Sequence, residues 1–256
     1  MKLIVLGSGT STGVPRIGND WGECDPEEPK NRRSRVSIVV QSNAGARILV
    51  DTSTDLRNQL LATGIDAVDA VVWTHDHADH CHGIDDLRPM RFGRSAALPG
   101  FASNDTARNL KQRFSYVFAG RHGYPSIVDL QTLERVKIVA GFGVKTCEMP
   151  HGPITSTAFR FESDGRTIGY ATDFNEITDE MSALFQGVDI LVTDCLRREG
   201  HPTHASLEMA LEFGRRTQAR VTVLTHLDKS MDYATLSAEV PSNVLVGFDG
   251  MEIDLG

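Results

Sequence analysis

The chain has 256 residues, of which 40% are hydrophobic and 23% are charged. This composition is typical of a globular protein and excludes a largely disordered chain, and the length allows one large domain or two small ones. The 26 Lys and Arg against 34 Asp and Glu give a formal net charge of −8. That charge argues against a broad surface for nucleic acid or anionic membranes, because such partners need a basic field.

The remaining composition favours a cytoplasmic protein without a membrane partner. Residues 1–6 form a strand-like run too short for a secretory leader, and no stretch approaches the ~18–20 apolar residues that span a bilayer. The four cysteines are far apart and form no CxxC pair, a distribution typical of reduced thiols. No repeat or linker divides the chain, so we expect a single domain over residues 1–256.

Short apolar, β-branched runs alternate with a few helical stretches along the chain. The predicted strands span residues 3–6, 36–40, 47–50, 70–73, 136–139, 144–148, 156–161, 167–171, 190–193, 221–224 and 244–246, and the predicted helices span 54–62, 105–114, 178–185 and 205–217. Asp164-Gly165 predicts a tight hairpin between two of these strands. So many strands with so few helices favour two sheets packed face to face with helices outside, rather than a doubly wound sheet.

Residues 83–129 fit this pattern least well, because their character is mixed and they contain many arginines. We interpret this segment as an excursion over one end of the sandwich. A solvated helix–loop segment with scattered charges is the alternative.

The clearest chemical feature is the run Thr74-His75-Asp76-His77-Ala78-Asp79-His80, directly after the predicted strand at 70–73. Three histidines with acids between them are costly to place together unless something holds the imidazoles deprotonated. A metal ion does so, because neutral imidazole and carboxylate are its ligands. The alternative is a histidine-rich surface loop.

Three further residues of the same kind each follow an apolar strand, namely His151, Asp173 and His226. Adjacent strands that end at one edge of a sheet would bring these side chains together. The full set is too large for one tetrahedral ion, and it suits two ions with three protein ligands each and a shared carboxylate. The predicted metal ligands are His75, His77, Asp79, His80, His151, Asp173 and His226.

The HxHxDH signature followed by His, Asp and His in this order resembles the metallo-β-lactamase fold hydrolases, along essentially the whole chain. The resemblance implies an αββα sandwich of two mixed β-sheets flanked by helices, with the site at one edge. It implies that His75, His77 and His151 hold one ion. It also implies that Asp79, His80 and His226 hold the other, and that Asp173 bridges them. Zinc or manganese suits these ligands, and iron is a third option.

Further segments are similar to the phosphodiesterase branch of this superfamily, which includes the phosphoribosyl 1,2-cyclic phosphate phosphodiesterases of phosphonate breakdown. They are residues 7–15, 31–35, 194–197, 201–204 and 248–251. The resemblance implies hydrolysis of a small cyclic phosphodiester of a sugar phosphate or nucleotide by a metal-bridging hydroxide. A glyoxalase II-like thioester or other acyl hydrolase, a tRNA 3′-processing nuclease and a catalytically idle binding module are the alternatives.

The resemblance also suggests roles outside the ligand set. Asp79 would orient the nucleophile, His204 would be the general acid, and His201 would support it or contact phosphate, although both histidines could be loop or capping residues. Arginine binds phosphate best, so the candidate substrate contacts are Arg32, Arg33, Arg35 and Arg88, each of which could instead be a surface or ion-pair residue.

The family places an acid that orients a metal-binding histidine at the position of Asp51, and Asp249 is a similar candidate. The expected partner is a small phosphorylated substrate. We expect no stable nucleic-acid partner, and a homodimer is possible.

Overall fold

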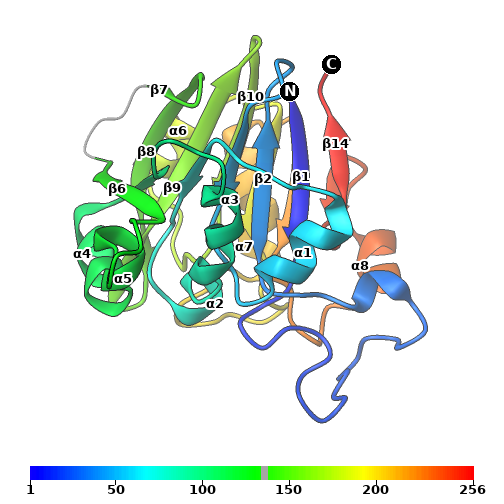
Figure 1. Ribbon diagram of the computed structural model, residues 1–256. Helices are drawn as coiled ribbons and strands as arrows, with labels where there is room; N and C mark the ends of the chain where they lie inside the picture. Colours follow the sequence, from blue (N-terminus) through cyan, green and yellow to red (C-terminus); the bar gives the residue numbers. More distant parts are fainter. Residues whose placement is uncertain (134–137) are drawn as a thin grey trace.

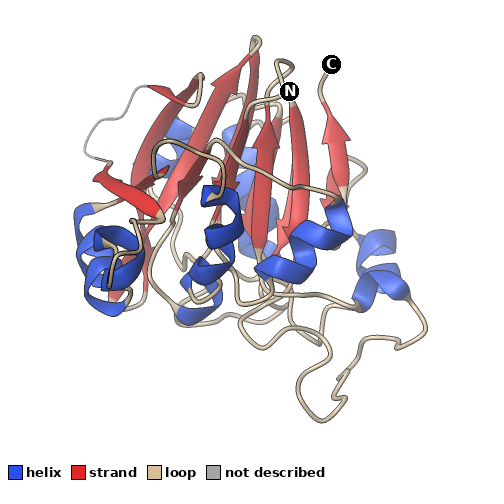
Figure 2. Ribbon diagram, in the orientation of Figure 1, coloured by secondary structure: helices blue, strands red, loops and turns tan. Residues whose placement is uncertain are grey.

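Two seven-stranded β-sheets pack face to face, and helices cover the outer face of each sheet (Figures 1 and 2). The computed structural model describes residues 1–133 and 138–256. Both sheets contain parallel and antiparallel pairs. This αββα arrangement of two mixed sheets confirms the fold class predicted from the sequence.

The first sheet combines the N-terminal strands with the last strand of the chain. In the order β14-β1-β2-β3-β4-β5-β6, its strands span Glu252–Asp254, Lys2–Gly7, Ser37–Gln41, Arg47–Val50, Ala70–Val72, Leu98–Ala102 and Val128–Thr132. Strands β3 to β6 pair in parallel, whereas β14, β1, β2 and β3 pair antiparallel. The carboxyl ends of β3, β4 and β5 therefore lie at the same edge of this sheet.

The second sheet holds the remaining strands. In the order β13-β12-β11-β10-β9-β8-β7, they span Val244–Val246, Val221–Thr225, Ile190–Asp194, Arg166–Ala171, Ile154–Ser163, Phe142–His151 and Ile138–Val139. Strands β10 to β13 pair in parallel, and β7 to β10 pair antiparallel. Asp164 and Gly165 join β9 to β10 with φ angles of 56° and 70°, which is the tight hairpin predicted from this dipeptide.

The central strands are apolar on both faces. In β2, Ile38 and Val40 pack into the core between the sheets, whereas Val39 packs into the layer beneath the helices. Successive side chains of a strand point to opposite faces, so a strand covered on both sides must be apolar throughout. This is why the sequence shows continuous apolar runs rather than alternation.

Short helices cover the two outer faces. Over the first sheet lie α1 (Leu56–Thr63), α2 (Ala78–Cys81), α3 (Arg88–Arg91), α4 (Asn104–Arg113) and α5 (Ser115–Ala119), with the 3₁₀ turns η1 (Pro29–Asn31) and η2 (Ile84–Leu87) in the loops of this half. Over the second lie α6 (Asp179–Leu184), α7 (Leu207–Thr217) and α8 (Tyr233–Glu239). Among the described residues, no helix has the length and apolarity needed to cross a bilayer.

Residues 83–129 do not form an excursion over one end of the sandwich, so that interpretation is wrong. Strand β5 lies within this segment and pairs with β4, and α3, α4 and α5 cover the outer face of the same sheet. Sequence patterning missed β5 because its residues, Leu-Pro-Gly-Phe-Ala, include two types that are depleted in strands. Gly100 is required there, since a Cβ would lie 2.5 Å from Val128 Cγ1.

The other predicted elements are present with bounds shifted by a few residues. Sequence patterning also missed β6, β14 and the short helices α2, α3, α5 and α8. These helices are too brief for a helical period to show. Of the strand predicted at 136–139, residues 136 and 137 lie outside the described residues, and the other two form β7.

Packing of α7 on the second sheet gives a direct test of the fold. The ring of Phe213 is fully buried and contacts the rings of Phe174 and Phe185. Phe213→Ala should therefore lower the free energy of unfolding by about 3–5 kcal/mol. Ile17→Ala, at a fully exposed position, should change it by less than ~0.5 kcal/mol. Chemical denaturation measures both values, and equal effects would contradict this packing.

Candidate metal centre

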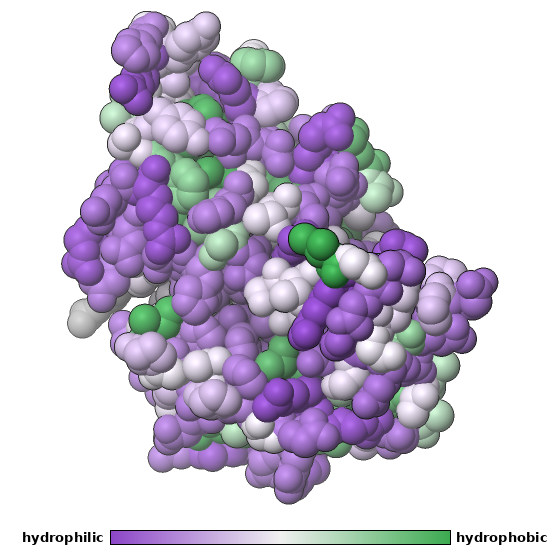
Figure 3. Space-filling model, turned by 90° about the horizontal axis from the view of Figure 1, so that it is seen from below, coloured by the Kyte–Doolittle hydropathy of each residue, from purple (hydrophilic) through white to green (hydrophobic). Residues whose placement is uncertain are grey.

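The predicted metal ligands are brought together at one end of the sandwich. His75 lies in the loop after β4, while Asp79 and His80 lie in α2, for which His77 is the N-cap. Three more ligands come from the second sheet, where His151 ends β8 and the residues Asp173 and His226 follow β10 and β12. Viewed from this side in Figure 3, the molecule is largely hydrophilic, with hydrophobic residues only scattered.

The carboxylate of Asp173 lies between two groups of ligand atoms. Its Oδ2 is 3.8 Å from His75 Nε2 and 3.6 Å from His151 Nε2, and Nδ1 of His77 is 3.3 Å from the same Nε2 of His151. Its Oδ1 is 3.3 Å from His80 Nε2 and 3.7 Å from His226 Nε2. One oxygen of the same carboxylate thus faces each group.

The second group is closed by Asp79. Its Oδ2 lies 3.4 Å from His80 Nε2 and 3.6 Å from His226 Nε2. Two ligand atoms of one tetrahedral ion, each about 2.0–2.2 Å from it, are about 3.3–3.6 Å apart. The observed separations in both groups are close to this value.

Buried nitrogens without partners support the same interpretation. The Nε2 atoms of His75, His80 and His226 are buried and have no hydrogen-bond partner among the described residues. Nδ1 of His80 is 2.7 Å from Asp51 Oδ2, so the ring donates a proton there, and once Nε2 is deprotonated it presents a lone pair at that atom. That lone pair faces two carboxylates, and electron-rich atoms placed this way need a cation between them. The residues therefore fit a divalent metal.

Neighbouring groups fix the orientation of the ligand rings. Asp51 accepts hydrogen bonds from the backbone N–H and the hydroxyl of Thr74, and it holds His80, which is the role predicted for it. The carbonyl of Thr203 lies 2.6 Å from His151 Nδ1. These contacts leave Nε2 of both rings directed toward the cluster, as the histidine ligands of metal sites require.

Three of these residues have a left-handed backbone. Asp51, Asp173 and His226 have φ angles of 63°, 65° and 60°, and each follows a strand. Residues with side chains rarely adopt this conformation, which costs on the order of 1–3 kcal/mol and is concentrated at functional sites. Here it turns each side chain back toward the shared edge of the sheets.

Burial and neighbouring charges set the protonation of the cluster. Burial and the adjacent His80 hold the pKa of His75 well below its usual value. Burial also disfavours the charged form of His80, but the carboxylates around it outweigh this effect and raise the pKa of His80 well above its usual value. Burial opposes ionisation of Asp173, yet His226 and His80 lower its pKa well below the usual range. The carboxylate between the two groups is thus ionised at neutral pH, as metal ligation requires.

His204 lies beside the same cluster, paired with an acid that the sequence analysis missed. Its Nδ1 is 3.0 Å from Asp194 Oδ2, and its ring stacks on His226 with centroids 4.7 Å apart. Asp194 is fully buried at the end of β11 and also lies 3.7 Å from His226 Nδ1. Its position after an apolar strand, the signal used for Asp173, could have identified it.

A cavity of about 330 Å³ opens over the cluster. It is lined by Ser11, His77, Asp79, His151, Pro153, Ile154, Asp173, Thr203, His204 and His226. The candidate general acid and five of the seven candidate ligands therefore face one cavity.

Two of the four candidate arginines are misassigned as phosphate contacts. Arg33 is 2% exposed, and its guanidinium donates to the carbonyls of Asp228 and Met231 at 3.2 and 2.6 Å, so it fastens two loops together. Arg88 lines a different cavity, where it lies over the ring of Tyr124.

The other two arginines also lie outside the lining of the ligand cavity. Arg32 lies over the ring of Trp21. Arg35 pairs with Asp55 at 3.0 Å and donates to the carbonyl of Ser11, a lining residue. Arg35 therefore acts from behind the cavity wall, and its predicted contact with phosphate stays a prediction.

One further prediction, that for Asp249, is corrected, and one of the two roles predicted for His201 is favoured. Asp249 accepts hydrogen bonds from Ser8 and Ser34 through both carboxylate oxygens, so it fastens the N-terminal loop rather than a metal-binding histidine. His201 does not line the cavity. Its Nδ1 accepts from Thr203, and its ring centroid is 5.2 Å from that of His204, so its geometry fits support of His204.

The fold and this cluster define a metal-dependent hydrolase of the metallo-β-lactamase fold. The family model of the β-lactamase superfamily domain matches residues 46–227, and the chain belongs to that superfamily.

The relatives differ in what they are described as doing. The chain is 33% identical over 98% of its length to an octanoyltransferase of Porphyromonas gingivalis, but it spans only 51% of that protein. It is similar to the crystal structure of a new diphosphatase from the PhnP family, with a TM-score of 0.89 and 36% identity over 98% of this chain and 96% of the other. Zn²⁺-bound PqqB from Methylobacterium extorquens shares the fold over the whole of both chains, with a TM-score of 0.77 and 19% identity.

Metal removal should destabilise the protein. An ion that binds only the folded chain stabilises it by about 3–4 kcal/mol at ~100–1,000 times its dissociation constant. Dialysis against a chelator should therefore lower the melting temperature, and added Zn²⁺ or Mn²⁺ should restore it. Calorimetry and elemental analysis measure the two effects together.

A matched pair of variants controls this experiment. Asp173→Ala should abolish the response of the melting temperature to metal, whereas Asp179→Ala, at an exposed carboxylate, should keep it. A wild-type melting temperature that is independent of metal would contradict the metal centre.

Proposed function

We propose that this protein is a dinuclear metal-dependent phosphodiesterase that hydrolyses a small, cyclic phosphodiester of a sugar phosphate or nucleotide. The observation that carries the proposal is the position of Asp173, with one carboxylate oxygen toward each group of ligands. His75, His77 and His151 would hold one ion, Asp79, His80 and His226 the other, and Asp173 both. When bound, the two ions would supply Lewis acidity and a water of lowered pKa.

The protein's own groups complete the site. Asp79 reaches the cavity at its ligand oxygen and would accept a hydrogen bond from the attacking water, which orients it. His204 would donate a proton from Nε2 to the leaving oxygen, since its Nδ1 is held by Asp194. The carboxylate of Asp194 fixes the direction of the ring. General acid catalysis of this kind contributes about 10²–10⁴-fold to a rate.

The charge of the cavity favours a diester over a phosphate of higher charge. None of the residues that line it in the described part of the chain is Lys or Arg. Compensation of the substrate's charge would therefore rest on the two ions, whose charge Asp79 and Asp173 already reduce. A phosphodiester carries one negative charge, which this arrangement accommodates best.

A diphosphate linkage is the second candidate. It is favoured by the similarity to the PhnP-family diphosphatase, which extends over nearly the whole of both chains at 36% identity. Both candidates involve attack at phosphorus and use the same groups. The acyl chemistry in the description of the Porphyromonas gingivalis relative, of which this chain spans 51%, is weaker support for a thioesterase.

Hydrolysis assays with added Zn²⁺ or Mn²⁺ test the reaction class. We expect turnover of bis(p-nitrophenyl) phosphate and 2′,3′-cyclic AMP, and no turnover of S-lactoylglutathione. ADP-ribose tests the diphosphate linkage. Asp173→Ala should remove the activity and so exclude a contaminant. Cleavage of the thioester without cleavage of either diester would overturn the proposal.

The loss of rate caused by replacing the proposed general acid, His204, should depend on the leaving group of the substrate. His204→Gln should slow hydrolysis of 2′,3′-cyclic AMP by about 10²–10⁴-fold, because the leaving alkoxide needs a proton. It should slow bis(p-nitrophenyl) phosphate much less, because p-nitrophenolate leaves without one. Steady-state kcat values for the two substrates measure the difference.

Two variants test the pairing with Asp194. Asp194→Asn should show the same substrate dependence with a smaller loss, because the ring keeps a polar neighbour. His82→Gln is the matched control, since that exposed ring packs on Phe114 and does not line the cavity. Equal losses on both substrates in His204→Gln would exclude a role as proton donor.

A further inference from the structure

A second cavity, of about 530 Å³, lies in the helical layer over the first sheet. Its walls come from η2, α3, α5 and the residues that follow α5. It shares no lining residue with the cavity over the metal ligands. Its volume is within the range of about 300–1,000 Å³ that is common for small-molecule sites.

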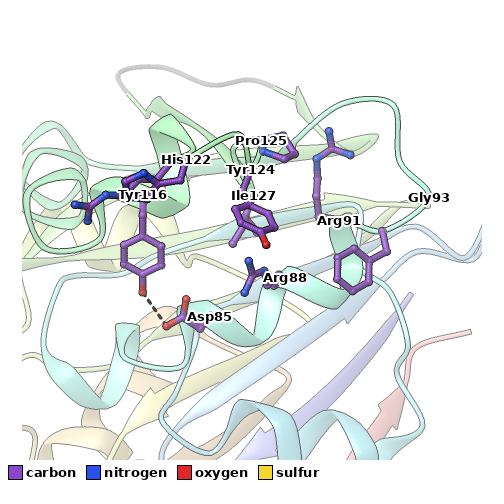
Figure 4. A pocket seen from close by; sticks show the side chains of 11 residues that line it. Asp85, Arg88, Arg91, Gly93, Tyr116, His122, Tyr124, Pro125 and Ile127 are labelled. Carbon is purple, nitrogen blue, oxygen red and sulfur yellow. Dashed lines mark hydrogen bonds between the residues drawn. The ribbon is translucent and has the colours of Figure 1, made fainter.

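The walls of this second cavity are aromatic. Figure 4 shows Tyr116 and Arg91 on opposite sides, with Tyr124 and Arg88 between them. Tyr124 is 67% exposed and Phe92 is 72% exposed. Two large rings exposed at one concave place mark a binding surface rather than a packed core.

The same cavity is positively charged, although the whole chain carries −8. Arg88, Arg91 and Arg121 line it, and none of them forms an ion pair with a carboxylate among the described residues. Asp85 is the one carboxylate in the lining of the described chain, and it already accepts the hydroxyl of Tyr116 at 2.8 Å. Three guanidinium groups thus line a cavity whose one described carboxylate already accepts a hydrogen bond.

The cationic groups are positioned rather than free. Arg91 donates from Nε to the carbonyl of Ser126 and from Nη1 to that of Arg94. The guanidinium carbon of Arg88 is 5.3 Å from the centroid of the Tyr124 ring. A guanidinium fixed beside an aromatic face can bind an acidic group while the ring stacks on the rest of the ligand.

The elements that wall the cavity are also fastened to one another. Tyr116 of α5 binds Asp85 of η2, and Arg113 at the end of α4 binds Asp76. Phe114 packs its ring edge on His82. The cavity is therefore preformed, which reduces the ordering cost of binding.

We propose that this cavity binds a small aromatic anion, a planar ring that carries a carboxylate or a phosphate. The ring lies against Tyr124, Tyr116 and Phe92, and the acidic group lies against Arg88 and Arg121. This site is separate from the metal centre and does not depend on the reaction proposed above.

Isothermal titration calorimetry with 2-naphthoate and 2-naphthyl phosphate tests the site and distinguishes the two acidic groups. At least one of them should bind with a dissociation constant of about 1 mM or below. The neutral 2-naphthol should bind at least ten-fold more weakly. Arg88→Met and Arg121→Met should each weaken binding of the anion about ten-fold, because charge-assisted hydrogen bonds are lost.

Arg220→Met is the matched control. That side chain is 62% exposed, lies near Asp189 and does not line the cavity, so binding should be unchanged. The replaced arginines of the cavity are exposed, so all three variants should fold, and circular dichroism verifies this. Binding that is equal in wild type, Arg88→Met and Arg121→Met places the anion elsewhere, the metal centre included, and overturns the proposal. Absence of binding by both anions overturns it as well.

Discussion

The arrangement of one end of this molecule follows from the burial of a single carboxylate, that of Asp173, which is 1% exposed. A buried carboxylate is stable only where cations or donors surround it. The hydroxyl of Thr172 donates to it at 2.8 Å, and five imidazole nitrogens lie within 3.8 Å, on both sides. Because the Nε2 atoms of His75, His80 and His226 have no hydrogen-bond partner among the described residues, bound metal ions would reconcile the carboxylate with its neighbours.

The topology of both sheets brings the groups that surround the buried Asp173 carboxylate to one end of the molecule. Asp51 follows β3 in the first sheet and holds His80, while Asp194 ends β11 in the second and holds His204. Each sheet thus supplies a buried acid behind a functional imidazole. Parallel strands make this possible, since their carboxyl ends meet at one edge and their connections lie on the outer faces. The left-handed residues at these ends then aim the side chains across the boundary between the sheets.

Whether a residue of the site could be predicted from the sequence depends on whether local structure alone fixes its position. A side chain directly after an apolar strand has its position fixed by local structure, so His151, Asp173 and His226 could be placed from patterning and motif alone. Arg33 could not, because its direction depends on how the loop that contains it meets residues 228–231, nearly 200 positions away. Strand β5 was hidden for a different reason, since it contains Pro99, a type depleted in strands, and Gly100, which is required by close packing on β6.

The distribution of cations separates two kinds of anion recognition in this chain. Over the metal ligands, the described lining has histidines and carboxylates but neither Lys nor Arg, so an anion is held there only as strongly as the ions allow. In the cavity beside α3 and α5, three arginines have no carboxylate partner among the described residues, so an anion there would be held by the chain itself. Guanidinium groups keep their charge at every physiological pH, whereas ligand imidazoles and carboxylates must lose protons before they bind metal. The affinity of the cavity over the metal ligands for an anion would therefore vary with metal supply and acidity. The affinity of the cavity beside α3 and α5 would vary mainly with ionic strength.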